Sequence, residues 1–218
     1  MIKLIDLIKE SNKILVPRRS PEERQKNYII ATQRKIKKYM DDGGKGDLDL
    51  SDTPITSLPN GLKVGGYLNL YDTPITSLPN GLNVGGNLYL QDTKITSLPN
   101  GLSVGGHLNL SDTKITSLPN DLQVGGNLYL FNNTKITSLP NGLSVGGHLS
   151  LRNTPITSLP NGLNVGGNLN LSYTPITSLP KDLKLGGSLY LYDTSISKKY
   201  TKEQIRQMCP GVKGNIYM

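Results

Sequence analysis

The two histidines and the single cysteine are the residues in this sequence whose types most often serve metal binding or nucleophilic catalysis. His107 and His148 occupy equivalent outward positions of a repeated unit, so two strand steps of about 4.8 Å each are expected to separate them. That separation is too long for both imidazoles to bind one metal ion, and no third ligand is evident. Cys209 has no second cysteine for a disulfide or a cysteine metal site. We therefore predict no metal and no cofactor, and we interpret both histidines as surface residues.

The acidic residues and the glycine-rich segments also form no recognisable catalytic motif. Asp52, Asp72, Asp92 and Asp112 recur once per unit, and we expect them to serve a bend in the chain rather than acid–base chemistry. No Ser/His/Asp arrangement and no pair of carboxylates stands out. The Gly-Gly-Lys-Gly segment at 43–46 lacks the G-x-x-x-x-G-K-[ST] spacing of a phosphate-binding loop. The sequence therefore favours a protein that is not an enzyme.

Aromatic residues gather at outward strand positions and make the strongest candidate binding site. Tyrosine offers a large contact area at low entropic cost, and the asparagines beside it can adapt their hydrogen bonds. The residues predicted to contact a protein partner are Tyr67, Tyr71, Tyr89, His107, Tyr129, Phe131, His148, Arg152, Tyr190 and Tyr192. The alternative is that these rings only favour strand formation by packing against their neighbours.

A repeated unit sets the positions of these residues. From Leu48 onward it recurs eight times, at a spacing of 20 residues apart from a single spacing of 21, and it follows the pattern L-x-L-x-x-T-x-I-x-x-L-P-x-x-L-x-V. In Leu68-Asn69-Leu70 the side chains alternate, so the leucines point inward and residues 67, 69 and 71 point outward from a parallel sheet. One unit buries too little apolar surface to fold alone, and the units are therefore predicted to stack into a solenoid.

Threonines are the polar exceptions among the inward positions. We expect their hydroxyls to satisfy buried backbone groups at the bend after each strand. These residues are Thr73, Thr93, Thr113, Thr134, Thr154, Thr174 and Thr194.

The repeat pattern resembles the short leucine-rich repeat, with Thr73 and its equivalents where that family usually has asparagine. The resemblance covers residues 48–194, and the wording is most similar to repeats of bacterial effectors and of tailed bacteriophages and their hosts. It implies an α/β leucine-rich-repeat solenoid with a parallel β-sheet of about eight short strands on one face. It also implies a protein-binding scaffold in the cytoplasm of a bacterial or phage-infected cell, or a component of the virion.

Helices are predicted on both sides of the repeats. Ser20-Pro21-Glu22-Glu23 has the form of a capping box and predicts a helix from residue 20 to about residue 40, and an earlier helix is expected over residues 2–10. One face of the longer helix is expected to pack on the first repeat and carries Tyr28, Ile29, Thr32, Ile36 and Met40. The opposite face carries Arg24, Arg34, Lys35 and Lys38. Thr201-Lys202-Glu203-Gln204 predicts a short helix that ends at Cys209, followed by an extended segment at 212–218. We divide the chain into an N-terminal helical cap (1–46), eight repeats (47–194) and a C-terminal helical cap (195–218), which together form one domain.

The net charge of +8 is concentrated at the two ends of the chain. Residues 1–46 contain 12 Lys/Arg against 6 Asp/Glu, residues 47–194 contain 7 against 9, and residues 195–218 contain 5 against 1. A uniform cationic groove for nucleic acid is therefore not predicted. An alternative function is binding of nucleic acid or an anionic surface through Arg18, Arg19, Arg24, Lys35, Lys37 and Lys38. Glycan binding on the tyrosine face is a further alternative.

The fifth repeat is one residue longer than the others and reads Phe131-Asn132-Asn133-Thr134. We predict that the extra residue bulges beside Tyr129, re-aims Phe131 and marks a binding hot spot. No stretch approaches the roughly 18 apolar residues of a membrane span, and no signal-peptide cleavage site follows the first apolar residues. A monomeric cytoplasmic protein is expected.

Overall fold

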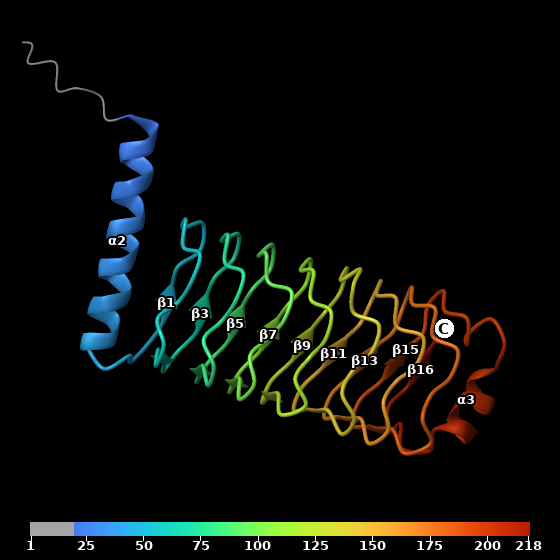
Figure 1. Cartoon of the computed structure of the whole chain (residues 1–218). Helices are drawn as coiled ribbons and strands as arrows, with labels where there is room; N and C mark the ends of the chain where they lie inside the picture. The colour runs from blue at the N-terminus through green and yellow to red at the C-terminus, as the bar shows by residue number, and fades with distance from the viewer. Residues whose placement is uncertain (1–19) are drawn as a thin grey trace, which may run out of the picture.

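The computed structural model describes residues 20–218, which form a parallel β-solenoid with one helix at each end (Figure 1). Leu68 pairs with Leu88, and Leu88 pairs with Leu108, so one coil takes 20 residues. The nine strands of the first sheet are, in spatial order, β1 (Leu48–Asp49), β3 (Leu68–Asn69), β5 (Leu88–Tyr89), β7 (Leu108–Asn109), β9 (Leu128–Tyr129), β11 (Leu149–Ser150), β13 (Leu169–Asn170), β15 (Leu189–Tyr190) and β16 (Ile216–Tyr217).

A second parallel sheet runs along the solenoid, where the sequence predicted only one. Each of its strands comes from the L-x-V part of the unit, directly before a Gly-Gly pair. In spatial order these strands are β2 (Lys63–Val64), β4 (Asn83–Val84), β6 (Ser103–Val104), β8 (Gln123–Val124), β10 (Ser144–Val145), β12 (Asn164–Val165) and β14 (Lys184–Leu185). Each coil therefore has two short strands, joined by the bend at its glycine pair.

The interior of the solenoid contains the apolar residues of the repeat, as predicted. In the coil that begins at Leu68, the side chains of Leu68, Leu70 and Ile75 are fully buried, and those of Leu78 and Leu82 are nearly so. One continuous core extends from Ile36 in the N-terminal helix to Ile216 in the last strand. Because each coil buries its apolar side chains against the next, the stack is stabilised as one body.

The inward threonines bond to the backbone at the bend, as expected. Each hydroxyl donates to the carbonyl oxygen three residues earlier, at 2.6–2.9 Å. The threonines that make this bond are Thr53, Thr73, Thr93, Thr113, Thr154, Thr174 and Thr194. The buried hydroxyl is thereby satisfied within its own coil.

The fifth repeat differs from its prediction in two ways. Asn133, not Thr134, takes the inward position: it is fully buried, its Oδ1 accepts from the backbone N–H of Ile136 at 3.1 Å, and its Nδ2 donates to Thr113 Oγ1 at 3.1 Å. Thr134 is the extra residue and is exposed at the bend. The predicted bulge beside Tyr129 is also wrong, because Leu130 N–H still donates to Ser150 O and the ladder continues past Phe131. The bend absorbs the extra residue, since an asparagine side chain can satisfy two backbone N–H groups there.

The glycine pairs allow successive coils to approach closely. A Cβ on Gly125 would overlap the carbonyl oxygen of Gly105 in the preceding coil, and a Cβ on Gly126 would overlap His107 Nδ1. The same overlap recurs at the equivalent glycines along the rod. The close stacking of the coils therefore requires residues without side chains at these two positions.

Helix α2 (Pro21–Asp41) stands across the first coil and extends beyond it (Figure 1). Its capping box forms as predicted, with Glu23 N–H donating to Ser20 Oγ at 3.1 Å and Ser20 N–H donating to Glu23 Oε2 at 2.9 Å. Thr32 and Ile36 are buried against the first coil, but Tyr28, expected on the same face, is 47% exposed. Tyr39 packs against the core in a position the prediction did not include.

Helix α3 (Lys202–Met208) covers the other end of the rod and is followed by one further strand. Its predicted capping box is present, with Gln204 N–H donating to Thr201 Oγ1 at 3.3 Å. The segment after α3 is extended: Val212 bridges to Leu185 in the second sheet, and β16 pairs with β15 in the first. The predicted helix at 2–10 lies outside the described residues. Between residues 20 and 218, neither helix is both long and apolar enough to cross a membrane.

Candidate functional site

The outward residues of the first sheet form three columns along the rod, and the first column is a ladder of hydrogen bonds. In this column a side-chain atom accepts from the backbone N–H of the equivalent residue one coil later, at 2.7–3.1 Å. The residues that accept are Asp47, Asn87, His107, Asn127, His148, Asn168 and Ser188. Tyr67 also lies in this column, but its side chain has no acceptor atom close to the backbone of the next coil. The backbone N–H of Asn87 therefore makes no such bond. The first column therefore links successive coils.

Both histidines belong to this ladder. His107 Nδ1 accepts from Asn127 N–H at 2.8 Å, and His148 Nδ1 accepts from Asn168 N–H at 2.7 Å. An imidazole that accepts at Nδ1 is neutral and carries its proton on Nε2. The ring of His107 also meets Tyr129 edge-on, with centroids 6.3 Å apart. These contacts within the chain give both histidines a structural role, although part of each ring is accessible to solvent.

Tyrosines alternate with small polar residues in the second column. Tyr89 is half-buried, and its hydroxyl accepts from Asn87 Nδ2 at 2.8 Å. Tyr129 makes the same bond with Asn127 Nδ2 at 2.6 Å. Each asparagine thus bonds to the next coil through its oxygen and holds a tyrosine through its nitrogen. The rings are fixed in place before any partner binds.

The third column contains the most exposed tyrosines among the predicted contact residues. Tyr71 is 43% exposed and Tyr192 is 42% exposed, whereas Phe131 is half-buried against Tyr129 at a centroid distance of 6.5 Å. Ser111 and Ser172 are buried in the same column. The predicted hot spot at Phe131 therefore has less accessible surface than the two tyrosines nearer the ends of the rod.

A bend column follows the third column, and its residues have a left-handed backbone. Their φ angles lie between 49° and 61°, a region that Asp and Asn tolerate better than other side chains. The residues are Asp52, Asp72, Asp92, Asp112, Asn132, Asn153, Tyr173 and Asp193. Tyr173, at φ 61°, is the exception in type. This column also explains the recurring aspartates, which were expected to serve the bend.

Tyr173 lies within a group of exposed and half-buried side chains that we call the C-terminal aromatic cluster: Arg152, Tyr173, Tyr190, Tyr192 and Tyr217. The guanidinium carbon of Arg152 lies 5.0 Å from the centre of the Tyr173 ring, and that ring is 50% exposed. Tyr190 stacks on Tyr217 at 4.8 Å and lies 6.4 Å from Tyr192. The cluster offers several flat rings and one cation on a rigid sheet.

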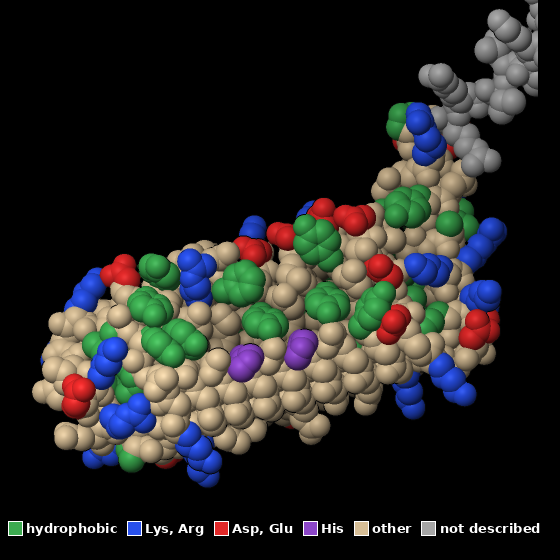
Figure 2. All heavy atoms as spheres, turned by 180° about the vertical axis from the view of Figure 1, so that it is seen from behind, with side chains coloured by type: hydrophobic (Ala, Val, Ile, Leu, Met, Phe, Trp, Pro, Cys, Tyr) green, Lys and Arg blue, Asp and Glu red, His purple; other side chains and the backbone are tan. Residues whose placement is uncertain are grey.

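At the other end of the rod, Tyr67 meets Tyr89 edge-on at 6.3 Å, and Tyr71 lies beside them in the third column. Figure 2 shows the face that bears the histidines, with hydrophobic side chains in a band along the rod. All ten predicted contact residues therefore lie on one sheet face, but most are also held by contacts within the chain. Tyr173 and Tyr217 belong to the same surface and were not among the predicted residues.

No known family matches this sequence, and no curated protein does.

Charge divides the same surface into two parts. The bend column carries aspartates in its first four coils and then Asn132, Asn153 and Tyr173. At the acidic end, Ser51 donates from its backbone N–H and its hydroxyl to Asp49 Oδ1, and these bonds hold the pKa of Asp49 below its ordinary value. Asp193 is paired with Lys198 at 2.6 Å. The C-terminal aromatic cluster is therefore free of the acidic row that borders the first coils.

The basic helix retains only part of its predicted cationic surface. Lys35 Nζ donates to the carbonyl oxygen of Asp49, and Lys37 pairs with Asp41 at 2.8 Å. Lys35 was expected on the helix face opposite the repeats, and its bond to β1 corrects that expectation. Arg18 and Arg19 lie outside the described residues. Between residues 20 and 218, no group of three or more His, Cys, Asp or Glu side chains could hold a metal ion.

Proposed function

We propose that this chain is a non-enzymatic scaffold of the leucine-rich-repeat type that binds another protein through the exposed residues of its first sheet. The fold supplies a rigid surface, since the ladder of side-chain acceptors fixes the outward residues. Binding to a surface that is already ordered costs little side-chain entropy. Tyrosine and arginine are also the residue types that most often dominate the affinity of protein interfaces.

Tyr173 is the observation that carries the proposal. A tyrosine with φ 61° stands where the other coils have Asp or Asn, and its ring is half exposed beneath Arg152. The backbone opposes this choice, because a left-handed conformation disfavours a bulky side chain. Strain of this kind is characteristic of functional sites. We therefore assign the C-terminal aromatic cluster, rather than Phe131, as the centre of the binding surface.

The test is a pull-down from bacterial lysate, to which the resemblance of the repeats directs the search. The binding variant combines Arg152→Ala, Tyr173→Asn and Tyr192→Ala. The matched control combines Lys63→Ala, Asn83→Ala and Asn164→Ala, which alter exposed positions of the second sheet. We expect a protein that binds the wild type and the control but not the binding variant. Its affinity for all three chains is then measured with the purified partner.

Circular dichroism checks that the binding variant and the control are folded, so that loss of binding does not reflect unfolding; of the three changes in the binding variant, Tyr173→Asn is expected to stabilise the fold. Equal binding to both variants would exclude the C-terminal aromatic cluster. Loss of the captured material after nuclease treatment would assign the binding to nucleic acid, and competition by free sugars would assign it to a glycan. Either result would contradict a protein partner.

A further inference from the structure

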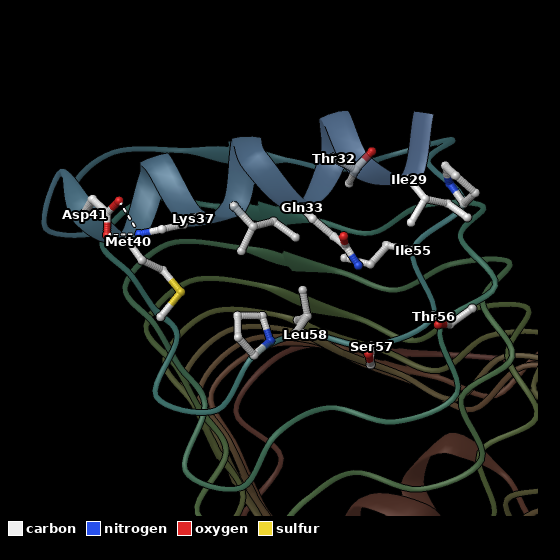
Figure 3. Close-up of a pocket in the computed structure, with 13 residues that line it drawn as sticks. Ile29, Thr32, Gln33, Lys37, Met40, Asp41, Ile55, Thr56, Ser57 and Leu58 are labelled. Atoms are coloured by element: carbon white, nitrogen blue, oxygen red, sulfur yellow. Dashed lines mark hydrogen bonds and ion pairs between the residues drawn. The ribbon is translucent and has the colours of Figure 1, made fainter. Parts of the chain in front are cut away.

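A groove between α2 and the first coil is an apolar hollow that the proposed function does not use. It encloses about 540 Å³ and is lined by Ile29, Ile36 and Met40 from the helix and by Ile55 and Leu58 from the coil. Figure 3 shows Ile29 and Met40 of α2 on one side of the gap and Ile55 and Leu58 of the first coil on the other, with the Lys37–Asp41 pair at one end. The helix therefore covers the first coil without closing over it.

The burial of Ile55 gives a measure of this incomplete cover. Ile55 is 8% exposed, whereas its equivalents Ile75, Ile95 and Ile115 are 0% exposed because another coil lies on each side of them. The terminal coil of a solenoid has no neighbour on its outer side and needs a separate element to cover its apolar surface. Helix α2 supplies that element over only part of the coil. Among residues 20–218, no other element covers the rest of this apolar surface.

The N-terminal segment has the composition to fill the groove. Its apolar residues are Ile2, Leu4, Ile5, Leu7 and Ile8, and it joins α2 at Ser20. Ile29 lies roughly 13 Å along the helix from Ser20, at about 1.5 Å per residue. The residues between Ile8 and Ser20 could span about three times that distance when extended. The segment can therefore fold back and reach the whole groove.

We propose that residues 2–8 of this chain dock in the groove and complete the cover of the first coil. Two apolar surfaces lie within reach of each other on one tether, and a short tether gives millimolar effective concentrations. A second copy of the chain or another protein would have to compete with that local concentration. This inference does not depend on the function proposed for the first sheet.

The absence of tryptophan from the sequence provides a clean test. Ile5→Trp places a single tryptophan in the segment. In the full chain we expect its emission to be shifted to shorter wavelength and its quenching by acrylamide to be several-fold weaker than in denaturant. Adding Ile29→Arg puts a charge in the groove and should expose the tryptophan. Adding Ile30→Arg, at the next residue of α2 but outside the groove lining, should leave it buried.

Three results would overturn the proposal. The tryptophan could be exposed in the full chain, or it could be equally buried in both arginine variants, which would place it elsewhere. Burial that weakens on dilution, together with a dimer in light scattering, would assign the groove to a second copy. Hydrogen exchange gives a check without tryptophan: removing residues 2–17 should speed exchange at Ile55–Leu58 and leave β9 and β11 unchanged. Unchanged exchange in the first coil would also contradict the proposal.

Discussion

At the scale of single residues, the outward side chains fall into two groups: some bond to the next coil and others are largely free of such bonds. Asn87, His107 and Asn127 accept from the next coil, whereas Tyr71 and Tyr192 are largely free of such bonds. Most residues of the first column therefore have a side-chain acceptor at the same height, and His and Asn are equivalent in this respect, whereas Tyr67 is an exception. In the third column, Ser111 and Ser172 are buried, but the exposed positions of Tyr71 and Tyr192 have no such constraint. The outward surface can change at these exposed positions at little cost in stability.

Tyr173→Asn should raise the free energy of unfolding by about 1 kcal/mol, because asparagine tolerates the left-handed backbone that tyrosine does not. Chemical denaturation of the purified proteins measures the difference. Asn153→Tyr, the reverse change one coil earlier at φ 55°, serves as the control and should lower stability by a similar amount. If Tyr173→Asn is less stable than the wild type, the tyrosine has a structural role and its assignment to binding loses its basis.

His107→Asn should leave stability almost unchanged, because asparagine makes the same bond in three other coils. His107→Phe keeps a flat ring, as Tyr67 does, but removes the acceptor for Asn127 N–H. A partly buried N–H without a partner should lower stability by about 1 kcal/mol. Urea denaturation of both variants provides the comparison. Equal stability of the two variants would mean that the ladder bond contributes nothing measurable.

At the scale of elements, the helix starts and the first sheet follow from short-range patterns. Each capping box is a local device, so Ser20-Pro21-Glu22-Glu23 was sufficient to place the start of α2. The alternation in Leu68-Asn69-Leu70 predicted which side chains face inward. The second sheet was missed because its strands, such as β4, lie between an Asn-Gly turn and a Gly-Gly pair, and both of these indicate turns rather than strands.

Other features depend on contacts between coils and could not be derived from one unit. The sequence pattern placed Thr134 at an inward position, whereas the bond from Asn133 to Thr113 in the preceding coil favours the asparagine. The ladder through His107 requires knowledge of which backbone N–H faces it. Tyr173 had a usable signal, since it is the only aromatic residue in a column of Asp and Asn. The sequence alone does not show that this column has a left-handed backbone, so the tyrosine became informative only once its φ angle was known.

The docking of α3 can be followed through Cys209, which is fully buried and whose Sγ lies 3.6 Å from Pro180 O. Burial raises the pKa of this thiol. The thiolate is therefore scarcer in the folded chain, and the stability that Cys209 contributes is present below the ordinary thiol pKa of about 8.5 and decreases as the pH rises above it.

We expect Cys209 to react with a thiol reagent at least about 100-fold more slowly in the folded chain than in denaturant at the same pH, since reaction requires α3 to open. The control is Gln207→Cys in a Cys209→Ser background, which places an exposed thiol in the same helix. That thiol should react at nearly the same rate in both states. Rapid reaction of native Cys209 would show that α3 opens readily.

At the scale of the whole molecule, the spacing between coils controls stability. A Cβ on Gly125 would overlap backbone rather than a movable side chain, so Gly125→Ala must push two coils apart. We expect a loss of at least about 2 kcal/mol, in the range found for overpacked cores. Gly142→Asn is the matched control: no atom lies within 4 Å of the added Cβ, and asparagine tolerates its φ of 71°. Equal denaturation midpoints for the two variants would mean that the rod expands freely.

The stacking of nearly identical coils also affects how the length of such a chain can change in evolution. Every inner coil presents to its successor the same kind of surface that it receives from its predecessor, and the first-column bonds recur at all but one of the junctions from Asp47 to Asn215. Duplication of one unit in frame would add a coil whose two neighbours have the same kind of contact surface as before. Deletion of one unit would leave the remaining contacts between coils intact. Duplication or deletion of one unit could therefore lengthen or shorten the recognition surface in a single step, without any new solution to the folding problem.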